Sequence, residues 1–228
     1  MALEGQVRSV VGANSSAVDL VTSEIRRAVL TGALPAGEQF SIRDLAAQLG
    51  VSHIPIREAL RRLESQGLIV LRQARSASVA PLSTSDLEAI YRLRHVVELP
   101  LAGASAGRRG PAEIARLDAL LEASRDRDPD VAWQGHYEFH EELVHPAANA
   151  WDDRVLHTLW MAAERYTHLV FDPTQITDDE RQRRYEKHRL LRDAALAVDA
   201  GAMAEALREH LSVNEDQIRD HIRAIEGH

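Results

Sequence analysis

Residues 40–70 read FSIRDLAAQLGVSHIPIREALRRLESQGLIV. Ser41 is a good helix N-cap, and the apolar spacing after it predicts a short helix that ends at Gly50. Ser52 is predicted to cap a second helix, which runs to about Gln66 and separates apolar from basic side chains on different faces. Two helices joined by a tight glycine-containing turn are the order of a helix-turn-helix, and its second helix would read DNA.

The flanking residues complete a winged version of this motif. Residues 18–31 repeat apolar side chains at helical spacing until Gly32 stops the helix. Residues 68–80 hold two β-prone runs around a polar tip, which is the pattern of a small hairpin. Helix, short helix, helix and hairpin follow one another as in a winged helix-turn-helix, to which we assign residues 1–82.

The rest of the chain shows only helical periodicity. Helices are predicted at residues 85–107, 111–124, 130–146, 150–169, 177–198 and 201–224. Capping boxes are predicted at Ser85–Glu88 and Thr177–Glu180, and Pro81 marks the junction between the two halves. The predicted fold class is therefore mainly α. A winged helix-turn-helix with a small β-hairpin wing precedes an all-α helical bundle over residues 83–228, which would serve effector or metal binding and dimerisation.

Composition restricts the class of protein further. Among 228 residues there is no cysteine, which excludes a disulfide framework, a thiolate metal site and a cysteine nucleophile. Without a signal peptide or an 18-residue apolar run, a cytoplasmic protein with no membrane partner is expected. Residues 1–82 hold nine arginines against seven acidic residues, whereas the remainder holds 18 basic and 28 acidic residues. The net charge of -8 thus belongs to the second half, and Arg57–Arg75 form a local basic surface suited to DNA.

The quoted stretch resembles the GntR family of transcription regulators, whose pattern is close to S-x-R-x-L-A-x-x-L-G-V-S-x-x-P-V-R-E-A-L-x-x-L-x-x-x-G. The resemblance implies DNA contacts from the second helix, the third helix and the wing tip, namely Arg43, Ser52, His53, Ile54, Arg57, Gln73 and Ala74. Guanidinium groups suit this task because they can fork to guanine or to phosphate. Relatives usually carry arginine in place of His53 and glycine in place of Ala74, so the operator sequence does not transfer from them.

Two of the eleven histidines stand at a spacing typical of metal sites. On a helix, His136 and His140 would project from one face, a geometry suited to a shared ion. The spacing alone leaves open that both are solvated or capped histidines.

The second half resembles the FCD domain, the ligand-binding domain of the FadR branch of the same family. Its pattern is D-x-x-F-H-x-x-L near A-A-x-N, with one further histidine in each of the last two helices. YEFHEELVHPAAN, YEKHRLLRDA and ALREHLSVN carry this pattern here. The resemblance implies a site for a divalent ion, zinc or nickel, made of His136, His140, His188 and His210, where His136 replaces the usual aspartate. It also implies effector contacts from Arg94 and Asn149, because a guanidinium pairs well with a carboxylate.

These patterns together predict a homodimeric, ligand-responsive transcription regulator rather than an enzyme. It would bind double-stranded operator DNA and act as a repressor that a small organic acid releases. A metal-dependent hydrolase with an appended DNA-binding domain is one alternative, although no HExxH motif is present and four histidines would fill a tetrahedral zinc ion. A purely structural metal, or a pocket whose histidines bind the effector directly, are the others.

Overall fold

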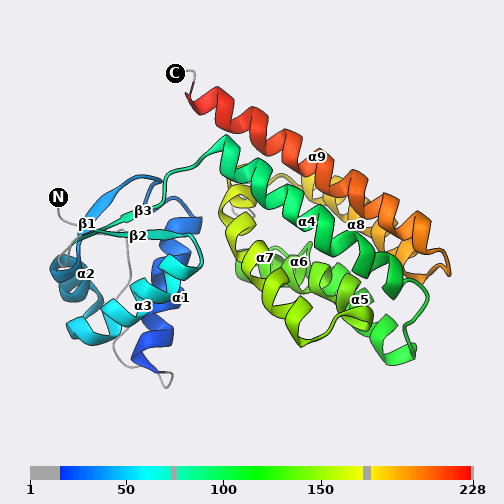
Figure 1. The fold of residues 1–228 in the computed structure, drawn as a ribbon, viewed down its shortest axis with the longest axis horizontal. Coiled ribbons are helices and arrows are strands. Elements are labelled where there is room, and N and C mark those ends of the chain that lie inside the picture. Colours follow the sequence, from blue (N-terminus) through cyan, green and yellow to red (C-terminus); the bar gives the residue numbers. More distant parts are fainter. Residues whose placement is uncertain (1–15, 73–75, 172–175, 227–228) are drawn as a thin grey trace. The chain divides into compact units, whose positions relative to one another are not determined.

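The computed structural model describes residues 16–72, 76–171 and 176–226. These fall into two compact units, one with the described residues up to Thr84 and Met161–His168, the other with Ser85–Trp160 and the described residues from Leu169. The elements follow in the order α1 (Ala17–Leu30), β1 (Gln39–Ser41), α2 (Ile42–Leu49), α3 (His53–Ser65), β2 (Ile69–Arg72), β3 (Ser76–Val79), α4 (Thr84–Ser105), α5 (Pro111–Ala123), α6 (Pro129–Val144), the 3-10 turn η1 (His145–Ala147), α7 (Ala150–Val170), α8 (Asp178–Leu196) and α9 (Ala200–Glu226) (Figure 1). The predicted fold class, mainly α with a small wing sheet, is confirmed.

The core of the first unit lies between α1, α2, α3 and a small antiparallel sheet of order β1-β3-β2 (Figure 1). Its largest fully buried side chains are Ile25, Leu34, Leu45, Leu49, Ile56, Leu60, Leu63, Leu68 and Ile69. The hairpin pairs Leu71 with Ala77, and Phe40 of β1 meets the same residue from the other side. Strand β1 was not predicted, because three residues are too few to show an alternating pattern.

Local hydrogen bonds fix where α2 and α3 begin. The hydroxyl of Ser41 accepts hydrogen bonds from the backbone N–H groups of Arg43 and Asp44, at 3.2 and 3.4 Å, which confirms the predicted cap. Gly50 then ends α2 with φ 71°, a left-handed conformation that glycine adopts without strain. Ser52 is the N-cap residue of α3, as predicted, but its side chain makes no capping hydrogen bond. The first N–H groups of α3 are therefore not satisfied by that hydroxyl and can bind an external acceptor.

In the second unit, α5 packs against both α6 and α8. The approach of α6 depends on Gly135, because a Cβ atom there would lie 2.7 Å from the Cβ of Ala123 and 2.8 Å from its carbonyl carbon. Any side chain at this position would push α6 away from α5. Gly135 directly precedes His136, so the close approach also sets the depth of the first predicted metal ligand.

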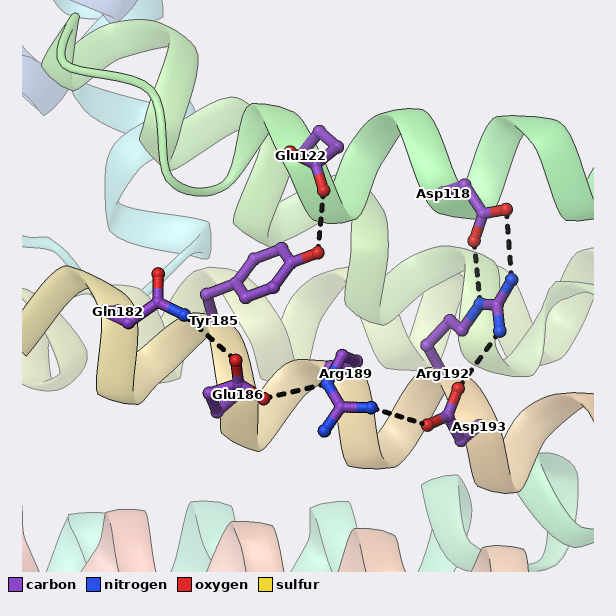
Figure 2. Close-up of polar contacts among 8 residues, drawn as sticks. All are labelled: Asp118, Glu122, Gln182, Tyr185, Glu186, Arg189, Arg192 and Asp193. Carbon is purple, nitrogen blue, oxygen red and sulfur yellow. Dashed lines mark hydrogen bonds and ion pairs between the residues drawn. The ribbon is translucent and has the colours of Figure 1, made fainter.

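Two polar contacts across the α5–α8 interface set the rotation of α8 (Figure 2). The Tyr185 hydroxyl donates to a carboxylate oxygen of Glu122 at 2.7 Å, and Arg192 donates to both carboxylate oxygens of Asp118 at 2.7 and 3.1 Å. Tyr185, His188 and Arg192 share one face of α8 by their spacing. Because such partly exposed pairs contribute at most about 1 kcal/mol, we infer that they orient His188 more than they stabilise the fold.

Most helix ends lie within two residues of their predicted positions. The predicted capping box of Thr177 and Glu180 is confirmed, with the Thr177 hydroxyl accepting from the Glu180 N–H at 3.3 Å and the Glu180 carboxylate accepting from the Thr177 N–H at 2.9 Å. Helix α4 already includes Thr84, so Ser85 lies inside its first turn and is not the cap. None of the described helices is both long and apolar enough to cross a membrane.

One guanidinium joins the carboxyl ends of three helices. Arg109 donates to the carbonyl oxygens of Ser105 in α4 and Ala195 in α8, each at 3.2 Å. It also donates to the carbonyls of Glu142 and Leu143 in the last turn of α6, at 2.6 and 2.9 Å. Carbonyls at a helix carboxyl end lack partners within the helix and carry partial negative charge. Arg109 therefore caps α4, α6 and α8 at once.

We expect Arg109→Ala to lower the free energy of unfolding of the second unit by about 2–3 kcal/mol, because hydrogen bonds from a charged donor are lost at three helix ends. Urea unfolding followed by tryptophan fluorescence measures this, since all three tryptophans, Trp133, Trp151 and Trp160, belong to that unit. Arg108→Ala, at the exposed neighbouring position, is the matched control. Equal stability of the two variants would contradict the capping role.

Candidate nucleic-acid interface and metal centre

Helix α3 separates a buried face from a face that is open to solvent. The buried face consists of Ile56, Ala59, Leu60 and Leu63. His53, Ile54 and Arg57 are exposed, and Ile54 keeps 78% of its surface in solvent. A large aliphatic side chain beside a cation at the start of a helix suits contact with a thymine methyl group in a major groove.

Two further residues predicted to bind DNA lie on the adjoining segments. Arg43 is on α2, which packs against α3, and its side chain is 85% exposed. Ser52 is exposed just before α3. The predicted wing-tip residues Gln73 and Ala74 lie outside the described residues. The helix pair thus presents Arg43, Ser52, His53, Ile54 and Arg57 to solvent, as an interface for an external partner requires.

The second site is a cluster of imidazoles between α6 and α8. His136 and His140 come from α6 and His188 from α8, and one ring nitrogen of each lies within 4.8 Å of the others. The Nε2 atoms of His140 and His188 are 3.3 Å apart. His140 and His188 are buried, while His136 is partly exposed. The predicted i, i+4 pair on α6 is therefore joined by a histidine 48 residues further along the chain than His140.

The donor atoms of this cluster fit a divalent ion. Nδ1 of His188 donates to the carbonyl oxygen of Arg184 at 2.7 Å, and because a carbonyl only accepts, Nε2 of His188 carries a free lone pair. Nδ1 of His140 is buried and has no hydrogen bond within the described part of the chain, so it can take the proton when Nε2 binds an ion. Two nitrogens bound to one tetrahedral zinc stand about 3.3–3.4 Å apart, as the two Nε2 atoms do.

His210 of α9 borders the cluster without belonging to it. Its ring centroid lies 5.0 Å from that of His140 and 4.9 Å from that of His188. Its Nε2 lies 3.1 Å from the side-chain nitrogen of Asn214 one turn further on, in hydrogen-bond contact. His210 as a fourth ligand therefore stays a prediction. Asn214 was missed, although its i+4 spacing from His210 could have indicated it.

The cluster is held in the neutral form at neutral pH. Burial lowers the pKa of His136, His140 and His210 well below the ordinary histidine value, and neighbouring imidazoles and the Arg94 charge add to this. Burial also lowers the pKa of His188 to about 4, against the opposing effect of its hydrogen bond to Arg184. Neutral imidazole is the form that binds metal ions, so the lone pairs are available without loss of a proton.

Of the two predicted effector residues, Arg94 lies near the cluster and Asn149 has a different contact. Arg94 is buried on α4 and forms an ion pair with Glu98, with nitrogen–oxygen distances of 2.6 and 3.4 Å. Asn149 is exposed, and its side-chain oxygen accepts from the N–H groups of Trp151 and Asp152 at the start of α7, at 2.8 and 3.3 Å. An effector role for Asn149 stays a prediction.

The chain combines a helix-turn-helix that has an exposed reading helix, a three-stranded wing sheet and a separate all-helical unit that holds a histidine cluster. This combination defines a DNA-binding transcription regulator whose second domain is of a ligand-binding type. Comparison with known proteins gives the family. Residues 18–79 match the model for bacterial regulatory proteins of the gntR family, and residues 88–213 match the FCD domain. The chain belongs to the GntR family and has the FCD architecture of its FadR subfamily.

Individual relatives agree with this assignment. The HTH-type transcriptional regulator BphR of Paraburkholderia xenovorans is 30% identical over 215 residues, which cover 90% of this chain and 86% of BphR. Mce2R of Mycobacterium tuberculosis, also an HTH-type transcriptional regulator, is 30% identical over 85% of this chain and 88% of its own. The solved structure of McbR/YncC from E. coli superposes with a TM-score of 0.74 at 24% identity, over 91% of this chain and 99% of that one. It supports the fold.

We expect the metal-free protein to lose stability as the pH falls from about 6.5 towards about 4. In this range the unfolded chain binds protons at histidines that the folded chain keeps neutral, so the free energy of unfolding decreases with decreasing pH, by about 1.4 kcal/mol per pH unit for each such histidine. Urea unfolding at a series of pH values measures the slope. His188→Gln should flatten it, whereas His145→Gln, at an exposed position, should not. If the wild-type protein and the two variants show equal slopes, the claim that the folded cluster is kept neutral is contradicted.

Proposed function

We propose that this chain is a homodimeric repressor that binds operator DNA through α3 and leaves it when a small organic acid binds beside the histidine cluster. The observation that carries the proposal is the presence, in one chain, of an exposed reading helix and a cluster of three histidines, two of them buried, whose nitrogens converge. The first suits a DNA groove and the second suits a ligand, as an effector-controlled regulator requires.

The exposed residues of α3 would make different kinds of contact with DNA. Arg57 can form paired hydrogen bonds to a guanine edge, and Ile54 can contact a thymine methyl group. The N–H groups at the start of α3, which the Ser52 side chain does not cap, favour a phosphate oxygen. A dimer would place two such helices in successive major grooves, roughly 34 Å apart, on a partly palindromic operator.

On the ligand side, His136, His140 and His188 would hold a divalent ion, zinc or nickel, with His210 as the predicted fourth ligand, and the ion would supply positive charge for an oxygen ligand. Neutral imidazoles bring no negative charge to offset it. The nearby Arg94 is balanced by Glu98, so the charge of the ion would dominate the site. An anionic effector such as a carboxylate is the ligand that this balance favours.

Control of DNA binding follows from linkage between the two sites. If the effector and the operator prefer different arrangements of the protein, each weakens the binding of the other by the same factor. Typical coupling of this kind changes affinity by about 5- to 150-fold. No contact between DNA and effector is needed.

We expect Arg57→Ala to weaken operator binding by about 5- to 150-fold, because a paired contact to one base is lost. Fluorescence anisotropy with a DNA fragment from the promoter of its own gene measures the affinity. Arg61→Ala, an exposed arginine of the same helix for which we propose no base contact, is the control and should change affinity less. If the two variants bind alike, or if the wild-type protein ignores the fragment at low salt, the assignment of α3 as the reading helix fails.

A second experiment separates a regulatory ion from a purely structural one. We expect the purified protein to contain a divalent ion by elemental analysis and His140→Ala to lose it, because two of three converging nitrogens would remain. A panel of small organic acids should lower the operator affinity of the wild-type protein and leave that of His140→Ala unchanged. An ion whose removal lowers the melting temperature, with no acid affecting DNA binding, would support the structural alternative and overturn the effector half of the proposal.

A further inference from the structure

Arg184 of α8 is a partly buried cation that forms no ion pair with another described residue. Its guanidinium lies over the ring of Phe171, 4.8 Å from the ring centroid. Burial lowers its pKa to about 10, with the charge of Arg181 adding to the effect, so the side chain is still charged at neutral pH. Within the described residues it has no ion pair and no side-chain hydrogen bond; only its backbone carbonyl is used, by His188.

Two other arginines of the same helix are paired with carboxylates. Arg189 pairs with Glu186 and Asp193, and Arg192 pairs with Asp118 (Figure 2). A buried charge without a partner is costly, and proteins keep one where a ligand completes the pair. The position of Arg184 therefore calls for an external anion.

Arg184 lines a groove large enough for such a ligand. The groove has a volume of about 690 Å³ and lies between the end of α7, the first half of α8 and the last part of α9. This is within the range of about 300–1,000 Å³ that small-molecule sites occupy. Arg183 and Lys187 line it with Arg184, and the acidic residues are Glu180 and Asp220. Three cations therefore face two carboxylates, of which that of Glu180 is also engaged in capping, as described above.

We propose that this groove is a second binding site, separate from the histidine cluster, for a small organic acid with two or more carboxylates. Arg184 takes one carboxylate through two parallel hydrogen bonds, a geometry for which the guanidinium is suited and which its stacking on Phe171 pre-orients. Arg183 and Lys187, both exposed, take the other. Since Arg184 is one helical turn before His188, a ligand here sits next to the helix segment that carries the metal ligand, without touching the ion.

Calorimetric titration of the full-length protein with succinate and with malonate, at constant ionic strength, tests this site. We expect binding to the wild-type protein and a loss of about tenfold or more in Arg184→Gln, because the paired charged hydrogen bonds disappear. Arg184→Lys keeps the positive charge but cannot form two parallel hydrogen bonds, so its affinity should lie between those of the wild-type protein and Arg184→Gln. Arg189→Gln is the matched control on the same helix and should bind like the wild type. Tryptophan fluorescence checks that each variant is folded.

The outcomes distinguish this site from the effector site proposed above. His140→Ala removes a residue of the histidine cluster and should bind both dicarboxylates normally. If His140→Ala loses binding while Arg184→Gln retains it, the acids bind at the cluster and the groove is not a site. Acetate binding as tightly as succinate would overturn the requirement for two carboxylates. Failure of both dicarboxylates to bind the wild-type protein would overturn the proposal as a whole, without bearing on DNA recognition.

Discussion

The helical unit depends on one close meeting, in which the imidazoles of His140 and His188 face each other with their Nε2 atoms 3.3 Å apart. Each helix is brought there by α5: Gly135 allows α6 to approach it, while Tyr185 and Arg192 fix the rotation of α8. Packing neutral imidazoles together in a buried place gains little by itself, since polar groups lose water there. The arrangement is physically reasonable if the lone pairs of the imidazole nitrogens bind a shared cation.

Three guanidinium groups of this unit are buried or partly buried, and each meets its charge requirement differently. Arg94 is matched by a carboxylate one turn away, Glu98. Arg109 is matched by carbonyl oxygens at three helix ends, which contribute partial charges in place of a full one. Arg184 alone of these has no such match in the described chain. The first two are part of the fold, whereas the third is intelligible through something that binds from outside.

The sequence predicted the helices well because their ends carry local signals, glycine, proline and capping side chains, that act over three or four residues. It was less informative where a hydroxyl or amide had two possible uses. Ser52 is the predicted N-cap residue, but its hydroxyl makes no capping hydrogen bond, and the side chain of Asn149, predicted to contact an effector, accepts hydrogen bonds at the start of α7. Of the cluster itself, spacing in the sequence indicated only His136 and His140. His188 lies too far along the chain for any periodicity to connect it, so it was found through family resemblance.

These cases have a common physical cause. Local rules assume that each polar group is satisfied by its neighbours in sequence, and most of the chain obeys them, as Ser41 and Thr177 show. Among the described residues, exceptions include the Ser52 hydroxyl, which makes no capping hydrogen bond, the Nδ1 atom of His140, which has no partner, and the charge of Arg184, which has no ion pair. Natural sequences tend to depart from local rules at functional sites, where a ligand provides the missing interaction partner. Each of these groups lies at a surface, cluster or groove for which we propose a partner, so recognition accounts for them better than imperfect folding does.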